Sequence, residues 1–158
     1  MKKLLLLLPV VLVLLSTSTV FASGKPERAF APIPQPLVIS GSCSFDVDAT
    51  VVKNNEYFKT FIDANGNLVR QLVNGSLVVT FTNLSNRHAI TVNISGPGYA
   101  TFYADGSFIQ RFEGNAAIFL PNLFILTSGR VDLKTFPDGS SVIVRMSGSQ
   151  RDVCALIS

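Results

Sequence analysis

Short runs of alternating apolar and polar residues are the feature of this sequence that most constrains its fold. Successive side chains of a β-strand point to opposite faces, so each run predicts a strand with one buried face. Val, Ile, Thr and Phe dominate the runs, and these residues favour strands over helices. The apolar positions form five clear sets: Cys43, Phe45, Val47, Ala49 and Val51; Leu77, Val79 and Phe81; Ile90, Val92 and Ile94; Val131 and Leu133; and Val142, Val144 and Met146.

Turn signals separate these runs. Asn65-Gly66, Asn74-Gly75, Asp105-Gly106 and Asp138-Gly139 each supply residues that tolerate the positive φ of tight hairpin turns. Pro121-Asn122 interrupts a further apolar stretch. We therefore predict an antiparallel meander of about nine or ten short strands, with no helix of three turns.

An antiparallel sheet of this size must either close into a barrel or fold into two layers to bury its apolar face. Two cysteines, Cys43 and Cys154, lie near opposite ends of the strand-forming region. In a secreted chain such a pair predicts a disulfide, with two buried free thiols as the alternative. A bond between them would pin the first strand against the last. We therefore predict an all-β fold, a closed or nearly closed β-barrel, with a two-layer β-sandwich as the alternative.

The N-terminus carries a targeting signal. Two lysines precede an apolar stretch over residues 4–15, and small residues follow up to Ala22. This pattern predicts a cleaved signal peptide over residues 1–22, because the apolar stretch is shorter than the roughly 20 residues of a membrane-spanning helix. Residues 23–36 contain four prolines and predict an extended tether. We expect a single all-β domain over residues 37–158, secreted to the extracellular space, with no later segment able to span a membrane.

The charge pattern argues against nucleic acid as a partner. The formal net charge is +3, and two of the positive charges, Lys2 and Lys3, belong to the predicted signal peptide. The remaining Lys and Arg residues occur singly along the chain, without the basic clusters that neutralise phosphates.

No complete set of catalytic residues is present. His88 is the one histidine, and it lies in a polar stretch that predicts a hairpin loop. Asp46 and Asp48 share the polar face of a strand, where we expect them to be solvated and not to form the carboxylate pair of a glycosidase. The segment 63–67 resembles part of a calcium loop, but its glycine comes too early and the later glutamate is missing. We therefore expect no catalytic residue, no metal and no cofactor.

Two features are candidates for ligand binding. Tyr99 and Tyr103 share one face of a predicted strand and could stack on a sugar ring, although an ordinary cross-strand aromatic pair is the simpler explanation. The phenylalanine-rich run from Phe108 to Phe112 could line the interior of a barrel that holds a small apolar ligand, or it could simply fill a core.

The order of several motifs resembles a group of uncharacterised small secreted bacterial proteins. These motifs are Cys43-Ser44-Phe45, Thr82-Asn83-Leu84, the run from Thr91 to Gly98, Thr127-Ser128-Gly129-Arg130 and Cys154-Ala155-Leu156. The resemblance covers most of the chain after the predicted signal peptide. It implies a secreted single domain and no particular activity.

Three functional hypotheses follow from the sequence. The leading one is a secreted, non-enzymatic binding or surface-associated β module, with a cell-surface glycan as its partner. The second is a β-barrel carrier of a small apolar ligand. The third is an extracellular carbohydrate-active enzyme.

Overall fold

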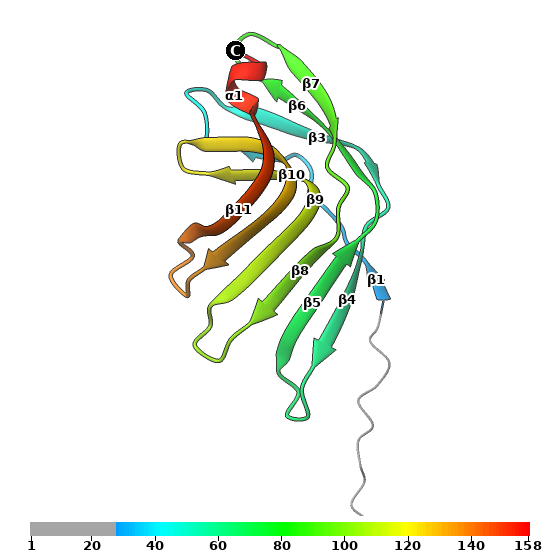
Figure 1. Ribbon diagram of the computed structural model, residues 1–158. Helices are drawn as coiled ribbons and strands as arrows, with labels where there is room; N and C mark the ends of the chain where they lie inside the picture. The colour runs from blue at the N-terminus through cyan, green and yellow to red at the C-terminus, as the bar shows by residue number, and fades with distance from the viewer. Residues whose placement is uncertain (1–27) are drawn as a thin grey trace, which may run out of the picture.

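The structure, a computed structural model, describes residues 28–158. The predicted signal peptide and the first part of the predicted tether lie outside the described residues. The described part of the chain is all-β, as predicted, and consists of two antiparallel sheets and one short helix (Figure 1). No helix within residues 28–158 has the length and apolar character needed to cross a membrane.

Seven strands form the larger sheet and four form the smaller one. The larger sheet has the order β1 (Arg28–Phe30), β4 (Tyr57–Ile62), β5 (Leu68–Asn74), β8 (Gly98–Phe102), β9 (Phe108–Leu120), β10 (Leu123–Thr135) and β11 (Ser141–Asp152). The smaller sheet has the order β2 (Val38–Ile39), β3 (Val47–Asn54), β6 (Leu77–Asn83) and β7 (Ala89–Asn93). The alternation predicted for residues 43–51 is confirmed, because Val47 and Ala49 are buried in the core.

Three stretches of chain cross from one sheet to the other with only a few residues between strands. β3 leads into β4, β5 leads into β6, and β7 leads into β8. Strands that pair in one sheet continue into strands that pair in the other. β3 pairs with β6, and their continuations β4 and β5 pair with each other; β6 also pairs with β7, and their neighbours along the chain, β5 and β8, pair in the larger sheet. The predicted meander is therefore present, but it is bent so that the two sheets face each other.

The predicted closed barrel is wrong, and the two-layer alternative describes the molecule. β8 and β9 pair as far as Gly98 and Phe112, and the amide of Glu113 donates to the carbonyl of Pro97 at 3.0 Å. Beyond this point β7 stays with β6 while β9 continues with β10, so the ladder divides. β11 ends the larger sheet and pairs only with β10. Residues 28–158 form eleven strands, and β9, β10 and β11 are 12 to 13 residues long, longer than the short strands predicted.

A row of three glycines bends these three long strands. Gly129 of β10 lies opposite Gly114 of β9 and Gly148 of β11, and all three have positive φ. A β-carbon on Gly129 would overlap the carbonyl oxygen of Ser147. Only glycine fits this conformation without strain, so the row sets where the long strands turn toward the smaller sheet.

Above the bend, the β9–β10 hairpin packs on both of its faces. Phe124 and Leu126 join the core of the smaller sheet, where the ring of Phe124 meets that of Phe81 edge to face, with 4.9 Å between centroids. On the other face, Ile118 and Ile125 form a second buried cluster, together with residues of the larger sheet. The hairpin therefore links the two sheets at one end of the molecule.

The predicted disulfide joins Cys43 and Cys154, whose Cα atoms lie 5.6 Å apart. Cys43 precedes β3, and Cys154 lies in α1 (Val153–Leu156), so the bond holds the terminal helix against the start of β3 and does not pin strand on strand. Val153 and Ile157 are fully buried there. The buried side-chain amide of Asn83 donates to the carbonyl of Ile157 at 3.0 Å, which fixes the C-terminus in place.

Part of the predicted tether is packed against the domain. β1 pairs with β4, and the buried residue Ala31 donates its amide to the carbonyl of Glu56 at 3.0 Å. The packed region thus begins ahead of residue 37.

Candidate functional site

A cavity of about 620 Å³ lies between the two sheets, below the β9–β10 hairpin. Its size falls in the range of small-molecule sites, roughly 300 to 1,000 Å³. The walls are mainly apolar, with contributions from both sheets and from the segment before β2. Wall residues include Ile33 and Leu37; Ala49, Val51, Leu77, Val79 and Phe81 of the smaller sheet; and Phe58, Val73, Ala100, Phe112 and Leu133 of the larger sheet.

The strand registers explain why these side chains share one face of the larger sheet. Thr60, Gln71, Ala100, Gln110 and Leu133 pair in sequence across β4, β5, β8, β9 and β10. Residues two positions away on each strand point to the same side. We call this side the cavity face. The opposite side of the seven-stranded sheet, below the row formed by Gly114, Gly129 and Gly148, is the outer face; above this row the same side of β9, β10 and β11 turns toward the smaller sheet.

Polar residues interrupt the apolar wall. Glu56, Gln71 and Gln110 lie among the apolar wall residues, and Asn115 and Ser141 also line the cavity. Gln71 makes one long contact, from Nε2 to the hydroxyl of Thr60 at 3.5 Å. Within the described residues, the carboxyl of Glu56 and the amide of Gln110 make no side-chain hydrogen bond. Their hydrogen-bonding groups therefore remain available to a molecule in the cavity.

Glu56 lies at the corner where β3 passes into β4, and its position is well defined. Its backbone amide donates a hydrogen bond to the side-chain oxygen of Asn54 at 2.9 Å, and its backbone carbonyl accepts one from the amide of Ala31. Burial of the carboxyl in this half-enclosed position raises its pKa above the usual range. A carboxyl group that is costly to ionise without a partner favours a ligand that donates a hydrogen bond or carries a positive charge.

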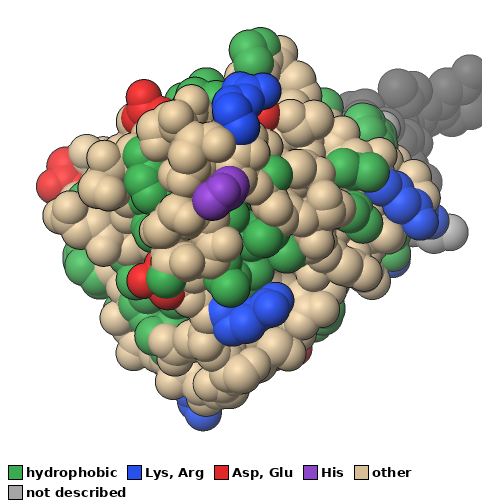
Figure 2. Space-filling model, turned by 90° about the horizontal axis from the view of Figure 1, so that it is seen from above, with side chains coloured by type: hydrophobic (Ala, Val, Ile, Leu, Met, Phe, Trp, Pro, Cys, Tyr) green, Lys and Arg blue, Asp and Glu red, His purple; other side chains and the backbone are tan. Residues whose placement is uncertain are grey.

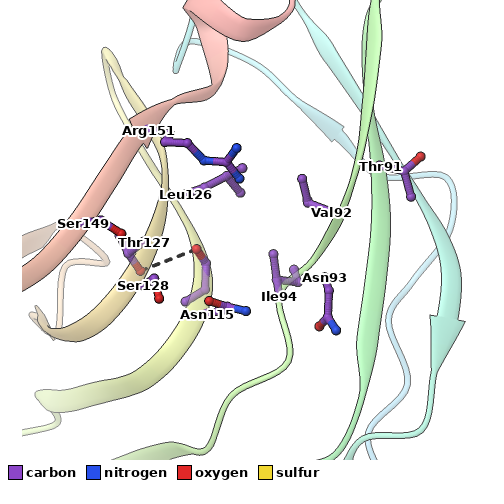
Figure 3. A pocket seen from close by; sticks show the side chains of 11 residues that line it. Thr91, Val92, Asn93, Ile94, Asn115, Leu126, Thr127, Ser128, Ser149 and Arg151 are labelled. Atoms are coloured by element: carbon purple, nitrogen blue, oxygen red, sulfur yellow. Dashed lines mark hydrogen bonds between the residues drawn. The ribbon is translucent and has the colours of Figure 1, made fainter.

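A second, smaller cleft of about 250 Å³ opens where β7 and β9 separate (Figure 3). In Figure 3, Arg151 and Leu126 point across the cleft toward Val92 and Ile94. The wall that carries Arg151 and Leu126, formed by β9, β10 and β11, otherwise presents mostly hydroxyl and amide groups, from Asn115, Thr127, Ser128 and Ser149. This cleft is a direct consequence of the divided ladder.

Tyr99 and Tyr103, the predicted ligand-binding residues, are not brought together as a stacking platform in the cavity. Tyr99 is among the residues that line the cavity, but strand register places its side chain on the outer face, where the guanidinium of Arg70 lies 5.1 Å from the centre of its ring. Tyr103 follows the end of β8 and is exposed in the turn that leads to β9. A role for either residue in ligand binding stays a prediction.

None of the residues considered for catalysis lines the cavity. His88 is exposed in the loop between β6 and β7, as predicted, and its Nδ1 lies 2.9 Å from the carbonyl oxygen of Ser158. Figure 2 looks down on this end of the molecule and shows charged side chains scattered singly among uncharged ones. Asp46 is exposed, and Asp48 accepts a hydrogen bond from Thr50 at 2.6 Å.

The segment 63–67 forms an ordinary turn. The carboxylate of Asp63 accepts hydrogen bonds from the side chain of Asn67 at 3.0 Å and from the amides of Asn67 and Asn65 at 2.9 and 2.8 Å. The side-chain bond and then the backbone bonds hold the pKa of Asp63 below its usual range. No group of three or more potential metal ligands among His, Cys, Asp and Glu occurs in the part of the chain that the structure describes.

The polar residues of the cavity were missed by the sequence analysis, although part of the signal was present. Gln71 sits between Val69 and Val73, and Gln110 sits between Phe108 and Phe112, each on the apolar side of its strand. A polar residue at a position that alternation assigns to the interior is a sign of a polar partner or a binding site. Glu56 gave no such signal, because it lies between two strands.

Fold and site together define an all-β protein of two antiparallel sheets around an apolar cavity with one acidic side chain. Compared with protein-family models, with curated proteins and with solved structures, the chain shows no significant match to any of them. The function is therefore argued from the site itself.

Proposed function

We propose that this chain is a non-enzymatic binding protein that holds a small, largely apolar ligand between its two sheets. The observation that supports the proposal is the apolar cavity of about 620 Å³ with Glu56, Gln71 and Gln110 in its wall. Its volume suits a molecule of about 10 to 20 non-hydrogen atoms with an apolar body, by analogy with drug-sized ligands in such sites. The polar end of the ligand would be a hydroxyl or an amine that donates to Glu56.

The same geometry favours binding over glycoside hydrolysis. Hydrolysis of a glycosidic bond ordinarily uses two carboxyl groups on either side of the bond, about 5 to 9.5 Å apart. Among the described residues that line the cavity, Glu56 is the one carboxylic acid. Asp46 and Asp48 belong to the polar side of β3 and its approach, away from the cavity wall.

Secretion, which the N-terminal sequence predicts, fits a protein that captures such a ligand outside the cell. An apolar ligand is poorly soluble in water, so its transfer into an apolar cavity is favourable by about 25 cal/mol for each Å² removed from water. The disulfide and the bent hairpin hold the two sheets together, which limits the ordering that binding would require.

The test is a panel of alkyl amines, alkyl alcohols and alkanoic acids of matched chain length, titrated against the purified protein by calorimetry. We expect amines and alcohols to bind more tightly than the acids, since an acid would place a second carboxyl group beside Glu56. Replacement Glu56→Gln should weaken amine binding by roughly tenfold, equivalent to one lost charge-assisted hydrogen bond.

Two variants of strand β8 test whether the ligand binds in the cavity. Ala100→Phe should fill the cavity and abolish binding, because Ala100 lies in its wall between Gln71 and Gln110. Thr101→Phe is the matched control, since Thr101 is exposed on the outer face of the same strand. Equal affinity of the two variants, each shown to be folded by its thermal transition, would contradict the proposal. So would the absence of binding across the whole panel.

A further inference from the structure

The outer face of the seven-stranded sheet gathers most of the basic residues of the chain. Ten Lys and Arg residues lie within residues 28–158, and seven of them belong to this face. They come from six different strands and are well separated in the sequence, which is why no basic cluster is visible there. The seven are Arg28, Lys59, Arg70, Arg111, Arg130, Lys134 and Arg145.

Strand register arranges these residues as a band across the sheet. One row crosses all seven strands, at right angles to them, and contains four of the basic residues. Adjacent strands lie about 4.8 Å apart, so the row extends over roughly 29 Å. The row runs through Arg28, Lys59, Leu72, Tyr99, Arg111, Asp132 and Arg145. Arg70, Lys134 and Arg130 lie in the rows on either side of it.

Most of this positive charge is not neutralised by the protein. Within residues 28–158, both of the ion pairs involve Asp132, whose carboxylate meets Arg111 at 3.1 Å and Arg130 at 2.5 Å. Glu113 is the other acidic residue of the face, opposite Arg130 on the neighbouring strand. In the part of the chain that the structure describes, Lys59, Arg70 and Arg145 therefore keep their charge free for a partner, while Lys134 has Asp105 of the β8–β9 turn as an acidic neighbour.

Several of the basic groups are also held in place before a partner arrives. Asp132 is buried beneath the guanidinium groups of Arg111 and Arg130, and its carboxylate fixes both of them by accepting hydrogen bonds from their Nε atoms at 3.1 and 3.0 Å. The guanidinium of Arg28 lies 3.6 Å from the centre of the Tyr57 ring. Groups that are ordered in advance lose less conformational entropy on binding.

We propose that the outer face of the seven-stranded sheet binds an extended anionic polysaccharide, one that carries carboxylate, sulfate or phosphate groups along its length. A band of unneutralised cations about 29 Å long matches a polymer with repeated negative charges better than a single small anion. Guanidinium groups bind carboxylate, sulfate and phosphate oxygens through paired hydrogen bonds, which gives Arg its advantage in such sites. This surface is separate from the cavity, so the two sites could act in one molecule.

Other anionic partners fit this face less well. Membrane insertion needs a continuous patch of exposed apolar side chains. The exposed large apolar residues of this face, Phe30 of β1, Leu68 of β5 and Val142 of β11, lie on separate strands, and none lies on β8, β9 or β10 below the glycine row. Single-stranded nucleic acid usually stacks its bases on open aromatic rings. Here a guanidinium lies over each of the two outer-face tyrosines, Tyr57 and Tyr99.

The experiment compares two triple variants that remove the same charge. The outer-face variant is Lys59→Gln, Arg70→Gln and Arg145→Gln. The control variant is Lys53→Gln, Arg87→Gln and Arg151→Gln, which also removes one Lys and two Arg but from exposed positions elsewhere. Both leave the Asp132 ion pairs and the cavity wall intact, and thermal unfolding confirms that each is folded.

The probes are dextran sulfate and polygalacturonate, with neutral dextran, phosphatidylglycerol vesicles and single-stranded DNA for comparison, at about 150 mM NaCl. We expect the native protein to bind both anionic polysaccharides and not dextran, more tightly than vesicles or DNA. The outer-face variant should lose roughly tenfold or more in affinity and show a shallower salt dependence, whereas the control variant should stay within about twofold. Equal losses in the two variants would show an effect of net charge alone and overturn the proposal. Tighter binding to vesicles or DNA, or binding to no polysaccharide at this salt concentration, would overturn it too.

Discussion

The two faces of the seven-stranded sheet are made from alternate residues of the same strands, yet they have opposite character. On β9, Gln110 and Phe112 belong to the uncharged wall of the cavity, while Arg111 between them belongs to the basic outer face. On β10, Leu133 lines the cavity and Asp132 joins the outer-face ion pairs. One strand therefore serves two surfaces, because successive side chains point in opposite directions. The cavity face and the outer face can therefore each be changed by substitution without altering the other.

The largest effect should come from the disulfide, which holds both faces in position by tying the terminal helix to the start of β3. The bond closes a loop with a sequence separation of 111 residues. Cys43→Ser, Cys154→Ser and the double variant should each lose about 2 to 5 kcal/mol of unfolding free energy, by similar amounts, because all three lose the same bond. Urea unfolding of the four proteins measures this. Unequal losses of unfolding free energy in the two single variants would show that one cysteine contributes through packing instead of through the crosslink.

The next effect tests the bend that makes the cavity face concave. Gly129→Ala should destabilise the protein by about 3 kcal/mol, because its β-carbon would overlap the backbone of β11 and its φ of 148° is unfavourable for alanine. Gly139→Ala is the control, since Gly139 also has positive φ but has open space around it, and it should lose only about 1 kcal/mol. The two midpoints of chemical unfolding give the comparison. Similar losses would mean that the glycine row does not set the bend.

A pair of neighbouring substitutions tests the two faces directly. Leu133→Ala should lose about 2 kcal/mol, at the low end for a buried leucine because it already borders a cavity. Lys134→Ala, one residue further along the same strand, should change stability by less than about 0.5 kcal/mol. The reverse should hold for binding to dextran sulfate, which only the second substitution should weaken. A result in which both substitutions affect both properties would break the separation of the faces.

The smallest effect is a pH dependence of opposite sign on the two faces. Burial raises the pKa of Glu56 above its usual 4.5, so the folded state retains the proton longer and stability falls as the pH rises through this range. Hydrogen bonds from Arg130 and then Arg111 lower the pKa of Asp132 below its usual 3.8, so its stabilisation is present above that pH and is lost as the pH falls through the lowered pKa. Glu56→Gln should therefore flatten the first trend and stabilise the protein at neutral pH. Asp132→Asn should flatten the acid trend, as unfolding curves measured between pH 2 and pH 7 will show. If the unfolding free energy of both variants changed with pH as steeply as that of the native protein, Glu56 and Asp132 would not be the groups responsible.

Local patterns predicted much of the fold correctly. Alternation predicted which residues of β3 and β6 face the core, because it depends on a few adjacent residues. Asn65-Gly66, Asp105-Gly106 and Asp138-Gly139 lie in hairpin turns as predicted, whereas Asn74-Gly75 lies where the chain crosses from β5 into β6 of the other sheet. The disulfide between Cys43 and Cys154 was predicted from their number and the predicted compartment. The prediction of a closed barrel was wrong, because closure depends on whether the first and last strands pair, which no local pattern in the sequence shows.

By itself the sequence determined that the chain forms antiparallel strands, which side of β3 and β6 is buried, and that its two cysteines can pair. The side predicted to be buried in the last strand was wrong, because Val142, Val144 and Met146 are exposed and Ile143 packs against the core instead. The tertiary structure decided where the ladder divides, how wide a cavity the two sheets enclose, and which distant side chains become neighbours. Arg70 and Arg145 are 75 positions apart in the sequence, and they share a face only because the meander places β5 and β11 in one sheet. Alternation depends on neighbouring residues and can be recognised locally. Register between strands and the bend at Gly129 depend on contacts between residues far apart in the chain, and these determine both candidate surfaces.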